Sequence, residues 1–194
     1  MTATRRESSG PDAAVSPGSS WLGSGWKRAT DATAGALLLV VASPVLALTA
    51  IAVRVRLGSP VLFRQTRAGR GGVPIGILKF RSMSDERDSA GDLLPDDQRL
   101  DGFGRFLRAS SLDELPQLVG VVRGDMSLVG PRPLPMAYLE RYDADQRRRL
   151  DAQPGITGWA QVHGRNALDW PSRFAHDVWY VDHASARVDL RILA

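Results

Sequence analysis

The chain has 194 residues, of which 43% are hydrophobic and 24% charged; this suffices for one globular domain and excludes a second full catalytic domain. The formal net charge of +4 favours anionic partners, such as nucleic acid, phosphorylated metabolites or lipid head groups, without choosing among them. No cysteine is present, so disulfides, thiolate metal sites and cysteine nucleophiles are excluded.

The first 25 residues are rich in Ser, Gly, Ala and Pro, and Trp21 is almost their only large apolar side chain. A segment of this composition cannot bury enough apolar surface to order itself. We therefore expect a disordered tail over residues 1–25.

An apolar segment follows, because residues 34–53 contain 20 positions without a charge. This length is typical of a membrane-embedded helix. A secretory signal peptide would have a shorter apolar run, and here basic residues follow the run at once. Basic residues flank the segment on both sides, which places both of its ends in the cytoplasm and conflicts with a simple span: Lys27, Arg28, Arg54 and Arg56.

Ser43 and Pro44 lie at the centre of this apolar segment. Each half is about 15 Å long as helix, roughly half of a hydrocarbon core. Proline removes a backbone donor, and a neighbouring serine hydroxyl can satisfy the freed carbonyl, so a break at Ser43 and Pro44 is tolerated in lipid. These residues alone leave two interpretations open, a kinked spanning helix and a re-entrant helix-break-helix.

Beyond the apolar segment the pattern predicts an α+β fold that is mainly helical. Residues 58–69 and 73–83 alternate apolar and polar side chains around glycine-rich turns, which predicts a short β hairpin. Residues 84–101 have the composition of a surface loop. Residues 100–109 predict a basic amphipathic helix that either lies on a membrane or packs on the core. A charged helix with a packing role is expected over residues 138–150.

The first candidate site is the sequence Ser110-Ser111-Leu112-Asp113-Glu114-Leu115. Both serines stand three residues before a carboxylate, which is the spacing of a helix capping box. A structural role is therefore one interpretation. The other is catalytic, because an ionised Asp113 could attack phosphorus without a general base. Glu114 with a divalent cation would then supply further charge neutralisation.

Cationic residues in the same half of the chain suggest a phosphate site, since a charge in apolar surroundings is costly unless it meets an anion. Arg132 is the most suggestive, because Pro131 and Pro133 fix the backbone on either side of it. Its alternative role is to satisfy loop carbonyls. The candidate cations are Lys79, Arg81, Arg105, Arg108, Arg123 and Arg132.

Four segments together resemble the bacterial sugar transferase family, the monotopic phosphoglycosyl transferases, over residues 27–194. They are KFRSM (Lys79–Met83), SSLDELPQL (Ser110–Leu118), RGDMSLVGPRP (Arg123–Pro133) and PGITGWAQVHGRN (Pro154–Asn166). The resemblance implies that the carboxylate of Asp113 attacks the β-phosphate of a UDP-sugar and releases UMP. Polyprenyl (undecaprenyl) phosphate then takes the phosphosugar, as the first membrane step of glycan or exopolysaccharide assembly.

The resemblance also implies roles for the other residues. Glu114 and Asp113 would hold Mg²⁺, and Lys79, Arg81, Arg108 and Arg132 would handle phosphate, with Pro131 and Pro133 beside them. A re-entrant membrane helix over residues 26–56, broken at Ser43 and Pro44, would be followed by a cytosol-facing catalytic domain over residues 57–194. The protein would then be monotopic in membrane lipid, on the cytoplasmic face of the bacterial inner membrane.

Two positions depart from the usual pattern of that family, Gly120 and His163, where asparagine is common. They put a nucleotide or sugar contact there in question. Two other functions remain as alternatives: a catalytically silent membrane scaffold of the same fold, and a basic nucleic-acid-binding protein. No nucleic-acid motif or aromatic stripe supports the latter, so we expect no nucleic-acid partner.

Overall fold

The computed structural model describes residues 17–164 and 167–194. The expected tail before residue 17 and the last two residues of the Pro154–Asn166 motif lie outside this part of the chain. The described residues are mainly helical, with one short β hairpin, which confirms the predicted fold class at that level. The largest cluster of buried apolar side chains joins α5, β3, α8 and α9, whose bounds follow.

The α-helices are α1 (Pro17–Leu22), α2 (Gly25–Leu57), α3 (Asp96–Arg99), α4 (Gly102–Ala109), α5 (Leu118–Arg123), α6 (Ala144–Arg147), α7 (Trp159–Val162), α8 (Trp170–His183) and α9 (Ala186–Leu193). The 3₁₀ turns are η1 (Arg70–Gly72), η2 (Leu112–Gln117), η3 (Met136–Arg141) and η4 (Arg148–Asp151). The strands are β1 (Leu62–Ala68), β2 (Pro74–Phe80), β3 (Ser127–Val129) and β4 (Gly155–Thr157).

Helix α1 corrects the expectation of a disordered tail that reaches residue 25. Trp21 explains the difference, because its indole Nε1 donates to Asp189 Oδ2 at 3.0 Å and its ring packs on the main core beside Leu22. One half-buried tryptophan contributes more apolar area than several of the small residues around it. The folded part of the chain therefore extends back at least to α1, which packs on α8.

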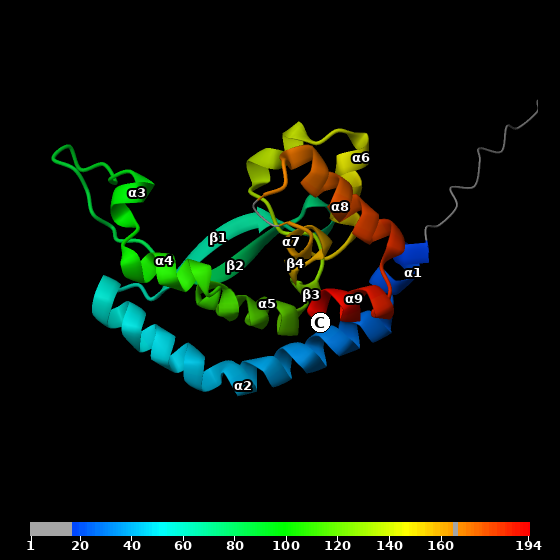
Figure 1. Ribbon diagram of the computed structural model, residues 1–194, viewed down its shortest axis with the longest axis horizontal. Coiled ribbons are helices and arrows are strands. Elements are labelled where there is room, and N and C mark those ends of the chain that lie inside the picture. Colours follow the sequence, from blue (N-terminus) through cyan, green and yellow to red (C-terminus); the bar gives the residue numbers. More distant parts are fainter. Residues whose placement is uncertain (1–16, 165–166) are drawn as a thin grey trace, which may run out of the picture.

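Helix α2 runs without interruption through Ser43 and Pro44, so the predicted complete break between two helices is not found. Pro44 has no N–H for the carbonyl of Val40, four residues earlier. The Ser43 hydroxyl donates to this oxygen at 2.7 Å, as the sequence predicted for a freed carbonyl. Figure 1 shows a single helix that bends midway, with both ends turned toward the rest of the molecule.

Both ends of α2 pack against the same body of the protein. Near the start of the helix, the Arg28 guanidinium donates to the carbonyl of Val121 in α5 at 2.9 Å. Near its end, Val53 is fully buried in a cluster with Phe80 of β2 and Leu107 of α4. The two arms are thus fixed to one structural unit.

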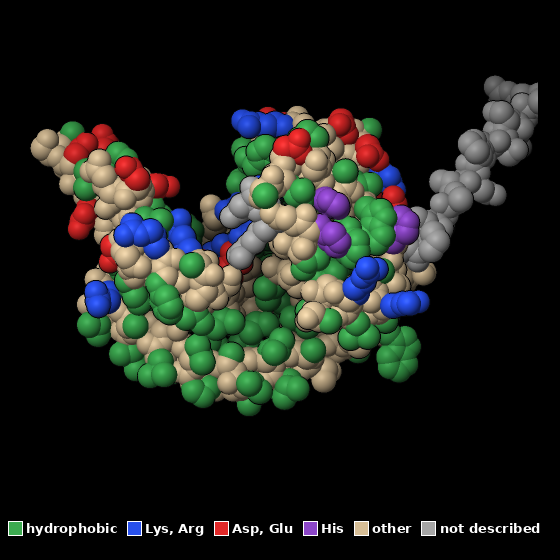
Figure 2. Space-filling view, viewed as in Figure 1, with side chains coloured by type: hydrophobic (Ala, Val, Ile, Leu, Met, Phe, Trp, Pro, Cys, Tyr) green, Lys and Arg blue, Asp and Glu red, His purple; other side chains and the backbone are tan. Residues whose placement is uncertain are grey.

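The opposite side of α2 is apolar and exposed. By length and composition, helix α2 is long and apolar enough to cross a membrane. Only 11% of its most apolar 18-residue stretch is buried. Figure 2 shows these hydrophobic side chains along the lower face of the molecule. The exposed apolar face of α2 consists of Leu37, Leu38, Val40, Val41, Val45, Leu48, Ile51 and Val55.

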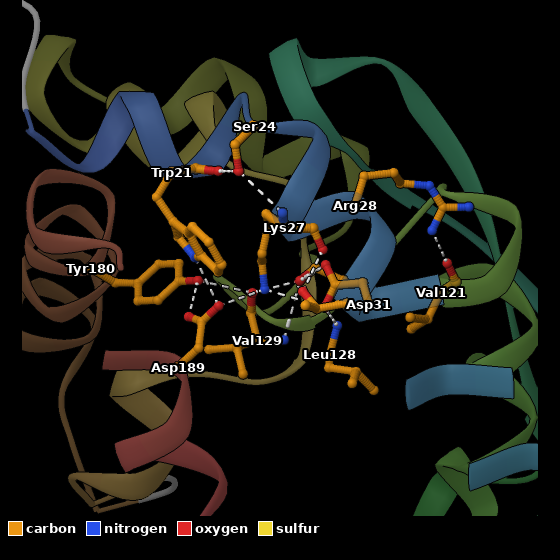
Figure 3. Close-up of polar contacts among 12 residues, drawn as sticks. Trp21, Ser24, Lys27, Arg28, Asp31, Val121, Leu128, Val129, Tyr180 and Asp189 are labelled. Carbon is orange, nitrogen blue, oxygen red and sulfur yellow. Dashed lines mark hydrogen bonds and ion pairs between the residues drawn. The ribbon is translucent and has the colours of Figure 1, made fainter. Parts of the chain in front are cut away.

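A buried polar network holds the start of α2 against β3 and α9 (Figure 3). The Lys27 ammonium lies 2.8 Å from the carboxylate of Asp189 in α9 and 3.2 Å from that of Asp31. Asp31 also accepts hydrogen bonds from the Ser127 hydroxyl at 2.8 Å and from the Leu128 amide at 3.2 Å. Two segments from opposite ends of the sequence are therefore joined to the strand that leads into the candidate site.

The predicted hairpin is confirmed by β1 and β2, which pair antiparallel from Leu62 opposite Phe80 to Ala68 opposite Pro74. A second pair of strands was not predicted, because β3 and β4 have only three residues each. They pair in parallel, and the Gly130 amide extends this pairing by donating to Thr157 at 2.9 Å. A Cβ on Gly130 would lie 2.2 Å from a backbone oxygen, so this close approach requires glycine.

The charged helix predicted over residues 138–150 is wrong, since η3, α6 and η4 occupy this segment. Asp143 causes the interruption. Its carboxylate accepts from the Gln146 amide at 2.8 Å, and the Gln146 side chain accepts from the Asp143 amide at 3.4 Å. This capping box starts a new helix and so ends the preceding one.

Candidate active site

The Asp113–Glu114 pair lies in η2, directly after α4. The capping boxes that the sequence allowed here are not formed: Ser111 makes no side-chain cap hydrogen bond and has a left-handed φ of 58°. The Ser110 hydroxyl donates instead to the carbonyls three and four residues before it, at 3.2 and 2.8 Å. The two carboxylates are therefore not used to cap a helix through these serines.

Glu114 is held by two cations. Lys79 Nζ of β2 lies 2.7 Å from Glu114 Oε1, and Arg132 Nη2 lies 2.6 Å from the same oxygen. Burial alone would raise the pKa of Glu114, but hydrogen bonds and charges from Arg132 and Lys79 outweigh burial and lower this pKa to about 2. Glu114 is therefore a permanent anion at physiological pH.

Asp113 has the opposite electrostatic environment. Its side chain is buried, and burial followed by repulsion from Glu114 raises the pKa of this carboxyl above its usual value. Lys79 and Arg108 act in the other direction. An ionised Asp113 is thus poorly solvated, which favours attack on an electrophile that enters the site.

Arg132 is presented by the loop after β3. Pro131 and Pro133 are buried and do not line the cleft, so they position Arg132 rather than contact a substrate there. Arg149 fixes the loop from behind, since its Nη2 donates to the Arg132 carbonyl at 2.7 Å. The same guanidinium forms a buried ion pair with Asp177 at 2.7 Å.

Of the remaining predicted cations, Arg105 and Arg123 are exposed and lie outside the cleft lining, whereas Arg108 and Arg81 line it in two different environments. Arg108 Nε donates to Ser82 Oγ at 2.9 Å, which leaves the charge of Arg108 near Asp113. Arg81 also lines the cleft, but its guanidinium is paired with Asp85 at 2.7 Å and donates to the Ser59 carbonyl at 3.2 Å. Arg81 therefore has a larger structural role than the sequence suggested.

These residues line a cleft of about 760 Å³ between the β1–β2 hairpin, α4 and α8. Phosphates carry several negative charges, so an excess of cations is what a diphosphate site requires. Among the described residues, five carboxylates line the cleft: Asp85, Asp96, Asp113, Glu114 and Asp177. They are outnumbered by the cations Arg67, Lys79, Arg81, Arg99, Arg108, Arg132, Arg149 and Arg173.

Several lining residues were missed by sequence reasoning. Arg149 was assigned only to packing. Its partners, Arg132 and Asp177, lie 17 and 28 residues away in the chain, so no local sequence pattern predicts these contacts. Arg67 was not among the candidate cations. Trp170 and Gln161 also line the cleft, and the Gln161 amide is buried without a hydrogen-bond partner among the described residues.

The fit of the expected Mg²⁺ can be assessed from the donor set. No group of three or more potential ligand side chains is found among the described residues. Mg²⁺ is usually held by one or two carboxylates together with substrate phosphates, and Asp113 with Glu114 supplies such a pair. The residues present are therefore compatible with a Mg²⁺ ion that arrives with a phosphorylated substrate.

Residues 22–194 match the family described as bacterial sugar transferase. The chain belongs to the bacterial sugar transferase family. It is 54% identical to the uncharacterized sugar transferase EpsL of Bacillus subtilis, over 86% of this chain and 83% of that relative. The family resemblance of the four sequence segments is thereby confirmed.

Two further relatives in the family have names that state a reaction. The chain is 44% identical to the UDP-glucose:undecaprenyl-phosphate glucose-1-phosphate transferase of Caulobacter vibrioides, over 86% of this chain and 66% of the relative. It is 35% identical to the UDP-N-acetylgalactosamine-undecaprenyl-phosphate N-acetylgalactosaminephosphotransferase of Aeromonas hydrophila, over 86% of this chain and 41% of the relative. The chain thus spans less than two thirds of both proteins.

The two positions that depart from the usual family pattern lie outside the cleft lining. A side chain at Gly120 would contact Met126 at an ordinary 3.5 Å, so this position belongs to the packing of α5. The His163 ring contacts that of Trp159, with ring centroids 3.9 Å apart and the planes tilted by 36°. In this structure both positions therefore contribute to packing rather than to the cleft.

Proposed function

We propose that the protein transfers a phosphosugar from a UDP-sugar to polyprenyl phosphate and releases UMP. The observation that carries this proposal is the buried Asp113 beside a Glu114 that Lys79 and Arg132 clamp in a cationic cleft. The named reactions of the Caulobacter and Aeromonas relatives support the same donor and acceptor classes. Glycan or exopolysaccharide assembly is the process that would consume such a lipid-linked product.

The first half of the proposed reaction forms a covalent intermediate. A carboxylate oxygen of Asp113 bonds to the β-phosphorus of the donor, and the bond from that phosphorus to the bridging oxygen breaks. The bridging oxygen keeps the electron pair and leaves with UMP. No proton transfer is required, because the nucleophile is already anionic and the leaving phosphate is a stable anion.

The second half reverses the bonding at Asp113. An oxygen of polyprenyl phosphate attacks the same phosphorus, and the bond to the Asp113 carboxylate breaks, which regenerates the free side chain. Lys79, Arg132 and Arg108 neutralise the charge that gathers on the phosphoryl oxygens in both halves. The Mg²⁺ ion that Asp113 and Glu114 would hold supplies additional charge neutralisation when it is bound.

Release of UMP tests the reaction directly. Detergent-solubilised protein is incubated with a panel of UDP-sugars, polyprenyl phosphate and Mg²⁺. We expect UMP with at least one sugar, and we expect Asp113→Asn to abolish turnover because an amide does not attack phosphorus. Asp125→Asn is a matched control, since Asp125 is exposed and lies outside the cleft.

Full activity in Asp113→Asn would exclude the covalent mechanism. Binding of UDP-sugar without release of UMP would favour the catalytically silent scaffold instead. The donor half-reaction can be isolated by omitting the lipid. Protein incubated with a donor labelled on its β-phosphate should then retain the label through denaturation, and Asp113→Asn should retain none.

For the membrane segment we propose a re-entrant arrangement on the cytoplasmic face. A helix of 33 residues that crossed a bilayer would place its two ends about 50 Å apart on opposite faces. Here both arms of α2 pack against the same body through Arg28 and Val53, and the exposed apolar face lies on the other side. Insertion of the bend into one leaflet reconciles both observations.

The absence of cysteine from the chain allows a clean test of this topology. Single cysteines replace Trp26 and Arg56, which are exposed near the two ends of α2. A membrane-impermeant maleimide should label both variants in inverted membrane vesicles and neither in intact spheroplasts. Labelling of the two variants from opposite faces would show a spanning helix.

A further inference from the structure

Arg67 is a cation of the cleft that forms none of the ion pairs found among the described residues. It projects from β1, and its hydrogen bond to a protein group runs from Nη2 to the neutral amide oxygen of Gln65, at 2.5 Å. Its Nε is buried and has no hydrogen-bond partner within residues 17–164 and 167–194. A half-buried guanidinium with this surplus of charge and donors is suited to an anion.

The position of Arg67 relative to the Asp113–Glu114 pair follows from its electrostatic neighbours. Burial and the nearby charge of Arg132 lower the pKa of Arg67, whereas Glu114 and the Tyr138 phenol raise it. Arg132 in turn contacts Glu114 directly. Strand pairing gives the place of Arg67 along the cleft: Phe63 is opposite Lys79, which contacts Glu114, and Arg67 lies four residues farther along β1 on the same face. Arg67 is therefore displaced along β1 from the Lys79–Glu114 contact.

Tyr138 belongs to a group of aromatic side chains beside the cleft, and two members of this group, Trp170 and Phe174, also line the cleft. Its ring centroid lies 5.2 Å from that of Trp170, which lies 5.7 Å from that of Phe174. Trp170 is 43% exposed, which is unusual for a tryptophan among aromatic neighbours. A small hollow of about 220 Å³, here called the aromatic annex, is lined by Tyr138, Arg141, Tyr142, Trp170 and Phe174.

We propose that the nucleotide half of the donor lies along this line, with its α-phosphate on Arg67 and its base against Trp170 in the aromatic annex. This inference rests on the proposed function, which supplies a UDP-sugar as donor. The order along the cleft then matches the order along the donor. The β-phosphate sits beside Asp113, the α-phosphate comes next, and the planar base is stacked at the end.

This placement gives Arg67 a part in the departure of UMP. When the bond between the β-phosphorus and the bridging oxygen breaks, negative charge develops on the α-phosphate. Arg67 can stabilise this charge without first giving up a carboxylate partner, in contrast to Lys79 and Arg132, which are already bound to Glu114.

Equilibrium binding of UDP to the full-length, detergent-solubilised protein with Mg²⁺ tests the site without turnover. We expect Arg67→Gln to weaken UDP binding about tenfold or more, as loss of a charged hydrogen bond does, and Arg67→Lys to restore part of it. Trp170→Leu should weaken binding by about fivefold or more, through lost stacking. Arg64→Gln is the matched control, because Arg64 is on the same strand but exposed and outside the cleft lining.

Unchanged UDP affinity in both Arg67→Gln and Trp170→Leu would overturn the proposal, and so would an absence of UDP binding to the unmodified protein. A loss that Arg67→Lys does not relieve, accompanied by a lower unfolding temperature, would show a structural role instead. Because no turnover is needed, a protein that binds UDP but releases no UMP would refute the proposed function and leave this nucleotide site in place.

Discussion

Asp113 and Glu114 are neighbours in the sequence, but their surroundings move their pKa values in opposite directions. Glu114 receives hydrogen bonds from Lys79 and Arg132, whereas Asp113 is buried beside the negative charge of Glu114. Two neighbouring carboxylates whose pKa values are shifted in opposite directions are typical of sites in which one group reacts and the other organises cations.

Substitution of Asp113 by asparagine should therefore leave the fold intact or strengthen it. The pKa of Asp113 is raised in the folded state, so its ionised form opposes folding above that pKa, and this cost disappears once pH falls below the unfolded value of 3.8. At pH 7 we expect Asp113→Asn to unfold at the same temperature as the unmodified protein or higher. Thermal unfolding in detergent at pH 7 and pH 4 checks this; a clear loss of stability at pH 7 would contradict it.

Glu114→Gln should lower the stability of the fold, and this loss should depend on pH in a different way. The folded-state pKa of Glu114 is lowered from 4.5 to about 2, so its stabilising contribution is complete above pH 4.5 and is lost as pH falls toward 2. We expect the glutamine variant to be less stable at pH 6, and the difference should narrow between pH 4.5 and pH 3. Urea unfolding of both proteins across this range measures it, and a difference independent of pH would refute the assignment.

At the level of residues, the family resemblance assigned Lys79 and Arg132 to phosphate handling, and in the structure both contact Glu114. The sequence could not predict the support behind Arg132. Arg149 reaches the Arg132 carbonyl only because the segment 138–151 folds into separate turns, and the capping box at Asp143 that causes this was not considered. That Arg67 forms no ion pair in the described part of the chain likewise depends on its three-dimensional neighbours, and its position in the sequence does not predict it.

Among the elements, the apolar composition of α2 was clear from the sequence, but its shape was not. The sequence left a kinked span and a broken re-entrant helix as equal alternatives, and the structure has a continuous bent helix. Short strands were also beyond reach, since three residues carry no detectable period. The longer β1–β2 hairpin and the amphipathic α4 had enough residues to be predicted.

The bend of α2 can be removed with one substitution. Pro44→Ala restores the amide that proline lacks and favours a straight helix by up to about 3 kcal/mol. A straight α2 cannot keep both Arg28 on α5 and Val53 on the Phe80 cluster. We expect lower UMP release and looser attachment of one arm, measured as faster hydrogen exchange over residues 25–35 or 50–57. Unchanged exchange in both arms would show that the surrounding contacts alone impose the bend. Val45→Ala, on the exposed apolar face, is the control.

In the whole molecule, the network around Lys27 joins the beginning and the end of the described chain. Its ammonium is the cation between the buried carboxylates of Asp31 and Asp189. Lys27→Met would leave both charges without this partner, and the expected loss of stability is about 3–5 kcal/mol. Chemical unfolding measures this loss. Arg28→Met removes a cation that is bonded to backbone carbonyls at the surface, so it should lower the free energy of unfolding by less. An equal loss of stability in both variants would show that the buried carboxylates do not depend on Lys27.

The burial of Val53 among Phe80 and Leu107 also decides whether α2 can be deleted without loss of the fold. In many membrane enzymes the lipid-embedded segment is an appendage, and cutting it away yields a soluble catalytic fragment. Here one side of α2 is exposed and the opposite side packs against the core. Deletion of α2 would expose the apolar side chains of α4, α5 and β2 that it now covers. Helix α2 and the part of the chain that carries the cleft therefore form a single folding unit, so a less apolar version of the protein would have to be made by redesigning the outer surface of α2 and not by shortening the chain.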